Sequence, residues 1–287
     1  MISILIPVYN YNIEPLIKVL SDQVSGTNAD YEIIVIDDAS TSIKYQKQDL
    51  LNYKNLSLIQ LDKNIGRSAI RNLLASKANY ENCLFIDAGN LPQSKSFINN
   101  YLDNLDNEVV IGGMVEADRK PKKPYRLRWL FTKQRERYSN DKVYTSANFM
   151  IKKEIVNKYP FDESVLQYGY EDLFFFNTLK ANSINLDFID NPVVHDCEED
   201  AYLFMRKIEQ GLENLAEFSV KNYELVKENN IVKLYQRIHR YRLDSLMTSV
   251  FKLTRASILK NLNSAYPSML LFDFYRLGYF CTMKHKL

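Results

Sequence analysis

Two adjacent carboxylates, Glu171 and Asp172, stand directly before a strongly apolar run in the stretch YGYEDLFF. Removing water from a charge is expensive, so acidic residues seldom enter apolar surroundings without a partner or a use. The simple interpretation is a helix N-terminus, where the helix dipole stabilises an acidic side chain by about 0.3–1 kcal/mol. The alternative is chemical, because burial against Leu173 and Phe174 raises the proton affinity of a carboxylate and suits it to act as a base.

Further polar residues follow segments that are predicted to be buried strands. Three such segments end in Tyr9-Asn10, in Asp37-Asp38 and at Asp87. In a mostly parallel sheet, ligands bind beyond the carboxyl ends of the strands. One aspartate at a strand end is more often a turn or helix-cap residue, but several at successive strand ends favour a shared site.

The elements that must position these residues alternate between strand and helix. Strands are predicted at 2–9, 31–40, 56–62, 82–89 and 108–116, and helices at 13–24 and 66–78. Strands that are apolar throughout and alternate with helices predict an α/β fold whose mostly parallel sheet is covered on both faces. Beyond residue 200 apolar residues recur at helical spacing, with long helices predicted at about 231–261 and 268–284. We therefore expect an α/β domain over 1–200 and a helical appendage over 201–287.

Composition limits the classes of partner. The 287 residues are 46% hydrophobic and 25% charged, which is typical of a globular protein, and a net charge of +2 argues against nucleic acid. Three widely spaced cysteines fit reduced thiols in a cytoplasm. No apolar run reaches the roughly 18 residues that span a bilayer.

The C-terminal part is basic. Residues 201–287 contain 14 Lys and Arg against 7 Asp and Glu. Residues 266–287 mix aromatic residues, leucines and terminal lysines, as helices at a membrane surface do. Packing of these helices on the rest of the chain or on a second subunit is the alternative that we favour.

Common nucleotide motifs are missing from the sequence. It has no GxGxxG after the first predicted strand and no GxxxxGK[ST] anywhere. A nucleotidyltransferase would need a glycine-rich loop with a lysine after that strand, and PVYNYNIEP has neither. A nucleotide that binds here must therefore be held by side chains.

Six segments resemble family 2 glycosyltransferases in both content and order. They are SILIPVYN, EIIVIDDAS, NIGRSAIRN, LFIDAGN, SANFMIKKE and GYEDLFF, and the resemblance covers about residues 2–195. It implies the GT-A fold and inverting transfer of a sugar from a nucleotide-sugar to a hydroxyl of a glycan or lipid-linked saccharide, with a UDP-sugar as the expected donor. The stretch NPVVHDCEEDAYLFMRKIEQGLENL is similar to bacterial members that build surface polysaccharides, in the cytoplasm or peripherally at the inner face of the membrane.

The resemblance also implies roles for single residues. The nucleotide site would consist of Pro7, Val8, Tyr9, Asp38, Arg71 and Asp87. In that site Asp38 hydrogen-bonds the base, whereas Arg71 contacts the base or the phosphates.

On the acceptor side, the resemblance makes Asp172 the catalytic base. Glu171 would orient the acceptor or support the loop. Asn148 would hydrogen-bond donor or acceptor hydroxyls. Trp129, the one tryptophan, would stack on a sugar, although a core position suits it equally well.

The metal-binding motif of the family is incomplete here. Asp87 takes the first position of its Asp-x-Asp pattern, but Gly89 replaces the second aspartate and Asn90 follows. A hard cation prefers carboxylate oxygens. Two alternatives remain: Asp87, His195 and the diphosphate hold Mn²⁺ or Mg²⁺, or cationic side chains replace the metal. Gly89 also leaves open a nucleotide-sugar-binding or regulatory protein that has lost catalysis.

Overall fold

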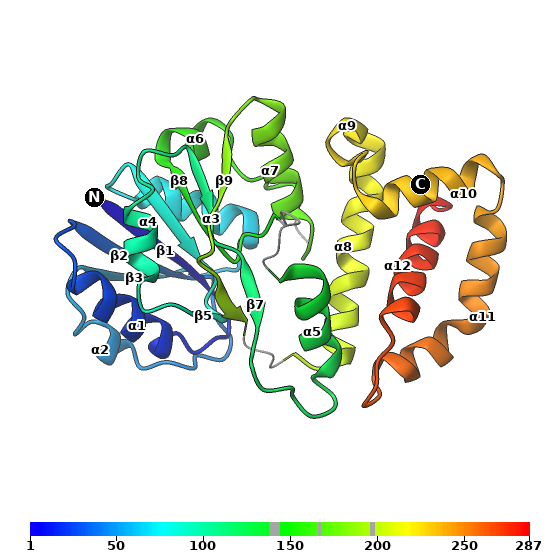
Figure 1. Ribbon diagram of the computed structural model, residues 1–287, viewed down its shortest axis with the longest axis horizontal. Helices are drawn as coiled ribbons and strands as arrows, with labels where there is room; N and C mark the ends of the chain where they lie inside the picture. The colour runs from blue at the N-terminus through cyan, green and yellow to red at the C-terminus, as the bar shows by residue number, and fades with distance from the viewer. Residues whose placement is uncertain (138–143, 166–167, 196–198) are drawn as a thin grey trace. The chain divides into compact units, whose positions relative to one another are not determined.

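The computed structural model describes residues 1–137, 144–165, 168–195 and 199–287, which form two compact units (Figure 1). Unit 1 consists of Met1–Ala117, Thr132–Leu166 and Glu171–Asp196. Unit 2 consists of Asp118–Phe131, Gln167–Tyr170 and Cys197–Leu287. Each unit is described by itself below. The boundary expected at residue 200 stays a prediction.

The main sheet of unit 1 has seven strands in the order β3-β2-β1-β4-β8-β6-β9. Its strands are β1 Ile2–Val8, β2 Tyr31–Asp37, β3 Leu56–Gln60, β4 Asn82–Ile86, β6 Val109–Ile111, β8 Asn148–Lys152 and β9 Leu186–Phe188. β8 runs antiparallel to its neighbours β4 and β6, and the other pairs are parallel. The expected mostly parallel sheet is confirmed.

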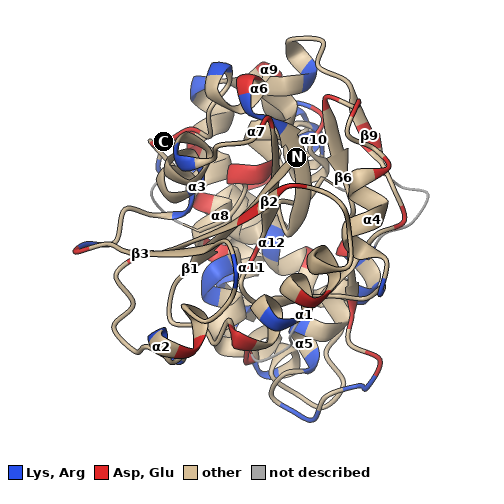
Figure 2. Cartoon of the chain, turned by 90° about the vertical axis from the view of Figure 1, so that its left-hand side faces the viewer, with Lys and Arg blue, Asp and Glu red and all other residues tan. Residues whose placement is uncertain are grey.

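Helices cover both faces of this sheet, as the unbroken apolar strands predict. The helices of unit 1 are α1 Glu14–Ser25, α2 Lys47–Leu50, α3 Arg67–Lys77, α4 Phe97–Leu102, α6 Lys153–Lys158 and α7 Glu171–Ala181. Ile4 of β1 belongs to a core with α1 and α4, whereas the next residue, Leu5, belongs to a core with α3, α6 and α7. In Figure 2 the strands are largely uncharged, and charged residues concentrate on helices and loops.

The strand expected over 108–116 is two strands in two different sheets. β6 ends at Ile111, and β7 Met114–Glu116 joins a small sheet with β10 Val193–His195 and β5 Asn90–Pro92, in the order β5-β10-β7. Gly112 and Gly113 make the change of sheet. A Cβ at Gly112 would overlap the side-chain oxygens of Asn148 and Tyr101, and Gly113 has φ of 80°.

Unit 2 is helical. Its helices are α5 Arg126–Phe131, α8 Ala201–Lys221, α9 Tyr223–Val226, α10 Asn230–Arg240, α11 Asp244–Leu262 and α12 Met269–Lys284. The helical stretch expected over 231–261 consists of two helices, α10 and α11, and Arg242 between them adopts φ of 56°. The π-helical turn Thr132–Glu136 of unit 1 follows α5 in the chain.

The core of unit 2 lies between α5, α8, α11 and α12. Phe272, Tyr275 and Phe280 of α12 are fully buried, so much of the apolar surface of residues 266–287 is used in packing. A Cβ at Gly278 would lie 2.6 Å from the Phe251 side chain, which shows how closely α11 and α12 approach. Among the described residues, no helix combines the length and the apolar character needed to cross a membrane.

Candidate active site

The loops that follow β1 and β2 are tied to each other at the carboxyl edge of the sheet. Asn10 adopts φ of 55°, its N–H donates to Ser40 Oγ at 2.7 Å, and its Oδ1 accepts from the Ser42 N–H at 2.8 Å. Tyr9 is 49% exposed. Pro7 is partly buried and Val8 is fully buried. Of these three residues predicted for the nucleotide site, Tyr9 is therefore the one that a ligand can reach most easily.

The two aspartates that end β2 fix loops in place. Asp37 is fully buried and accepts hydrogen bonds from the Ser40 N–H and from the Tyr45 hydroxyl. The carboxylate of Asp38 accepts from the N–H groups of Ile65 and Gly66 at 2.7 and 3.0 Å. Asp38 therefore positions the start of α3. A further hydrogen bond from Asp38 to a base stays a prediction.

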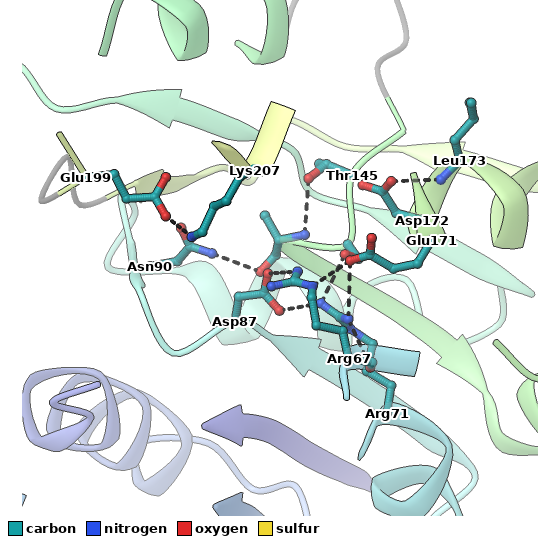
Figure 3. A network of polar contacts seen from close by, with 12 residues as sticks. Arg67, Arg71, Asp87, Asn90, Thr145, Glu171, Asp172, Leu173, Glu199 and Lys207 are labelled. Carbon is teal, nitrogen blue, oxygen red and sulfur yellow. Dashed lines mark hydrogen bonds and ion pairs between the residues drawn. The ribbon is translucent and has the colours of Figure 1, made fainter. Parts of the chain in front are cut away.

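Two arginines of α3 bind two carboxylates that come from other elements (Figure 3). Arg67 and Arg71 are four residues apart and so share one face of the helix. Arg71 Nη2 lies 2.6 Å from Asp87 Oδ1, and Arg67 Nη2 lies 3.3 Å from Asp87 Oδ2. Arg67 Nε lies 2.5 Å from Glu171 Oε1, and Arg71 Nη1 lies 3.9 Å from the same oxygen. Two positive and two negative side chains thus balance each other.

The two arginines differ in exposure. Arg71 is 1% exposed, and it also donates to Ser146 Oγ and to the Arg67 carbonyl. It has almost no surface to offer a ligand and acts here on Asp87. The side chain of Arg67 is 39% exposed. Arg67 is therefore the cation of this pair that an incoming anion can reach.

Glu171 and Asp172, the first two residues of α7, have pKa values that are shifted in opposite directions. Burial alone would raise the pKa of Glu171, but the charges of Arg67 and Arg71 outweigh it and hold that pKa below its ordinary value. Burial, reinforced by the negative charge of Glu171, raises the pKa of Asp172 from 3.8 to about 7. Asp172 Oδ1 accepts a hydrogen bond from the Leu173 N–H. A pair with its pKa values driven apart in this way can keep one carboxylate ionised while the other exchanges a proton near neutral pH.

The residues around Asp87 do not suit a divalent cation. Both carboxylate oxygens of Asp87 are bound by arginines, and no group of three or more His, Cys, Asp and Glu in the described residues could hold a metal. His195 lies in β10, in register with Asn90 and Glu116 on the neighbouring strands. A Cβ at Gly89 would lie only 3.2 Å from Tyr11 Cζ, so a larger residue in this place would be crowded. We therefore assign no step to a metal.

Two residues predicted to contact sugars are buried in the protein. Asn148 is fully buried, where its side chain accepts from the Tyr101 hydroxyl and donates to the Gly113 carbonyl. Trp129 belongs to unit 2 and is 7% exposed, which fits the alternative of a core position. The structure thus joins Asp87, Arg71 and Glu171 in one network and leaves Asn148 outside it.

Arg67 was missed in the sequence, although a signal for it was present. In NIGRSAIRN the two arginines stand at i and i+4, the spacing that places side chains side by side on a helix. Ser146 gave no such signal, because its contact with Arg71 depends on the pairing of β8 with β4.

Comparison with a family model identifies related sequences. Residues 3–160 match the model described as glycosyl transferase family 2. No curated protein sequence matches the chain closely enough to count as a relative.

Solved structures with a similar fold include two that contain a bound nucleotide or nucleotide-sugar. The mannosyltransferase PcManGT from Pyrobaculum calidifontis, in complex with GDP-Man and Mn²⁺, aligns with a TM-score of 0.58 and 12% identity over 99% of this chain and 86% of that chain. TarS 1-349 from S. aureus, in complex with UDP, aligns with a TM-score of 0.50 and 17% identity over 99% and 90%. At these identities the likeness shows a shared fold.

Proposed function

The chain belongs to glycosyl transferase family 2 and is a glycosyltransferase with the GT-A fold, and we propose that it transfers a sugar from a nucleotide-sugar to a hydroxyl group with inversion. The observation that carries this proposal is the pair Glu171 and Asp172. One carboxyl group is bound to two arginines, and its neighbour has a pKa near neutrality. That is the state that a general base working near pH 7 requires.

In the proposed reaction Asp172 removes the proton from the acceptor hydroxyl. The acceptor oxygen forms a bond to the anomeric carbon as the bond from that carbon to the diphosphate oxygen breaks. The nucleoside diphosphate leaves with the bonding electrons, and the proton stays on Asp172 until solvent takes it. Attack from the face opposite the leaving group inverts the anomeric centre. A base in this position typically contributes on the order of 10²–10⁴-fold to the rate.

For the donor we propose a UDP-sugar. The base would lie against Tyr9, with Pro7 and Val8 behind it, beside the loop that Asp38 holds. Asp38 is 4% exposed and would act on the pocket through that loop. The exposure of Tyr9 and the fixed loop around Asp38 support this assignment. The TarS structure contains UDP and the PcManGT structure contains GDP-Man, so both nucleotides belong in the donor screen.

We propose that Arg67 stabilises the negative charge that develops on the leaving diphosphate. It is the more exposed arginine of the network and lies beside Asp87. Asp87 contacts the ribose in this assignment, and buried Arg71 positions Asp87 rather than touching the donor. Cationic side chains stabilise such a leaving group through the same electrostatic effect as a metal ion.

The acceptor that we propose is a glycan or a lipid-linked saccharide of a surface polysaccharide. The reaction would take place in the cytoplasm or at the inner face of the membrane, as the family resemblance implies. Asn148 and Trp129 have no part in this assignment, because both side chains are buried.

The test is a screen of UDP- and GDP-sugars by calorimetry and by transfer assays, each repeated with EDTA. We expect UDP-sugar binding that survives EDTA. In the Asp172→Asn variant we expect donor affinity within a few fold of the wild type and transfer at least ~100-fold slower. Unchanged turnover in that variant would remove Asp172 from the mechanism.

The second candidate is a nucleotide-sugar-binding protein without catalysis, which the glycine at position 89 favours. It predicts donor binding with neither transfer nor donor hydrolysis, in the presence or absence of Mn²⁺. Release of UDP that depends on Asp172 would exclude it.

A further inference from the structure

Helix α11 carries an apolar stripe that faces away from its own core. The stripe consists of Leu243, which directly precedes the helix, and of Leu246, Val250 and Leu253, of which Leu253 is 85% and Leu246 61% exposed. The spacing of three, four and three residues aligns these side chains along one side of the helix. Since the face of α11 that packs on α12 is formed by other residues, such as Phe251 and Ile258, the stripe is a second apolar surface.

The surroundings of the stripe are cationic. Residues 230–262 contain seven Lys and Arg and one acidic residue, Asp244. Asp244 is buried and lies 3.3 and 3.4 Å from the imidazoles of His239 and His285, so it offers no outward negative charge. All seven cations are exposed, and two of them, Lys233 and Arg255, form salt bridges with Glu228 and Glu209. The other five, which we name the cationic rim, are Arg237, Arg240, Arg242, Lys252 and Lys260. In the described part of the chain no salt bridge joins an acidic residue to the rim.

We propose that α10 and α11 form a docking surface for an anionic lipid bilayer. The stripe would enter the boundary between headgroups and acyl chains, and the rim would meet the lipid phosphates. Helices with leucines on one side and Lys or Arg beside them bind interfaces in this manner. Long cationic side chains keep their charge in the headgroup layer while their stems lie along apolar surface. This proposal is independent of the proposed reaction.

The positive charge of the rim favours an anionic bilayer over a second copy of the chain as the partner of the stripe. Two copies joined through their stripes would bring two cationic rims together, and like charges at an interface are repulsive. Four side chains on one helix also cover much less than the roughly 1,000 Å² that a stable protein interface buries. An anionic lipid surface supplies the opposite charge to every residue of the rim.

The experiment is co-sedimentation of the whole protein with vesicles. We expect binding to vesicles of equal parts phosphatidylcholine and phosphatidylglycerol, and little binding to phosphatidylcholine alone. The double variant Leu246→Ser/Leu253→Ser should weaken partitioning at least about tenfold, because it removes the two most exposed leucines of the stripe. Arg240→Glu/Lys252→Glu should do the same, with a loss of the salt dependence.

Matched controls lie on unit 1. Ile43→Ser/Leu51→Ser removes two apolar side chains that are 53% and 54% exposed, and Lys18→Glu/Lys47→Glu reverses two exposed charges. Both controls should bind vesicles like the wild type. All substitutions are at exposed sites and should leave the unfolding transition unchanged.

Three results would overturn the proposal: no binding of the wild type to anionic vesicles, equal losses in stripe and control variants, or equal binding to both lipid compositions. Light scattering after gel filtration measures the molecular mass and so tests the remaining alternative, a dimer. Suppose that the wild type does not bind vesicles but forms a dimer, and that Leu246→Ser/Leu253→Ser dissociates this dimer. The stripe would then be the contact surface for a second copy of the chain.

Discussion

Replacing Asp172 by asparagine should abolish most transfer and, at alkaline pH, make the protein more stable. Burial and the charge of Glu171 raise the pKa of Asp172 from 3.8 to about 7. An acid with a higher pKa in the folded chain than in the unfolded chain binds its proton more tightly when folded. That contribution to stability is complete at low pH and is lost as the pH rises from about 4 to about 7.

The magnitude follows from the size of the displacement. Each pKa unit corresponds to about 1.36 kcal/mol, so ionised Asp172 costs the folded state about 4 kcal/mol at most. Asparagine has nearly the same shape, carries no charge, and keeps an oxygen that can accept from the Leu173 N–H. We expect the variant to gain about 2–4 kcal/mol of unfolding free energy over the wild type above pH ~8, and nothing below pH ~4.

Urea unfolding of both proteins over a series of pH values measures this difference. The control is Asp190→Asn, which removes a carboxyl group that is exposed, and it should show no gain that depends on pH. A variant of Asp172 that is no more stable than the wild type at alkaline pH would refute the reasoning. It would mean that the carboxyl group is solvated when the protein is folded.

Three further predictions concern the same site. The kcat/KM of the wild type should fall about tenfold per pH unit below about 7 and level off above, because only ionised Asp172 accepts a proton; a flat profile between pH ~5 and ~8 contradicts this role. Arg67→Met should lower kcat by about 10–100-fold. Arg67→Lys restores the charge but cannot bind Asp87 and Glu171 with a planar fork, so its kcat should recover only in part. Equal kinetics in the wild type and both variants would argue against a role for Arg67. Asp38→Ala should weaken UDP binding at least about tenfold and lower the free energy of unfolding by about 1–3 kcal/mol, because two partly buried backbone N–H groups lose their acceptor. Calorimetry and urea unfolding test both effects, and an unaltered dissociation constant refutes the pocket assignment.

Much of the fold could be predicted because its signals are local. Unbroken apolar strands such as ISILIPV predict a sheet that is covered on both faces, and β1 has that position. The strand expected over 108–116 was wrong as a single element, because the change of sheet at Gly112 depends on the close approach of Asn148 and Tyr101. That contact joins residues far apart in the chain, and nothing in the local pattern reports it.

The candidate site shows the same division. Carboxylates at strand and helix ends could be selected from the sequence, because an unpaired charge next to apolar residues is unusual. Which oxygen meets which guanidinium could not be predicted, because Asp87 and Glu171 come from β4 and α7 and meet on α3. The burial of Asn148 and Arg71 is likewise a property of the packed sheet rather than of the segments that contain them.

The state of Asp172 depends, step by step, on the spacing of two arginines. Asp172 has a raised pKa partly because the adjacent Glu171 remains ionised although it is buried. Glu171 remains ionised because Arg67 and Arg71 stand at i and i+4 on α3 and both face it. Their position is fixed in turn by Asp38, whose carboxylate binds the N–H groups of the two residues before Arg67. Asp38, at the end of β2, thus helps to set the proton affinity of Asp172 at the start of α7. We therefore expect substitutions at Asp38 to change nucleotide binding and also to shift the pH dependence of transfer.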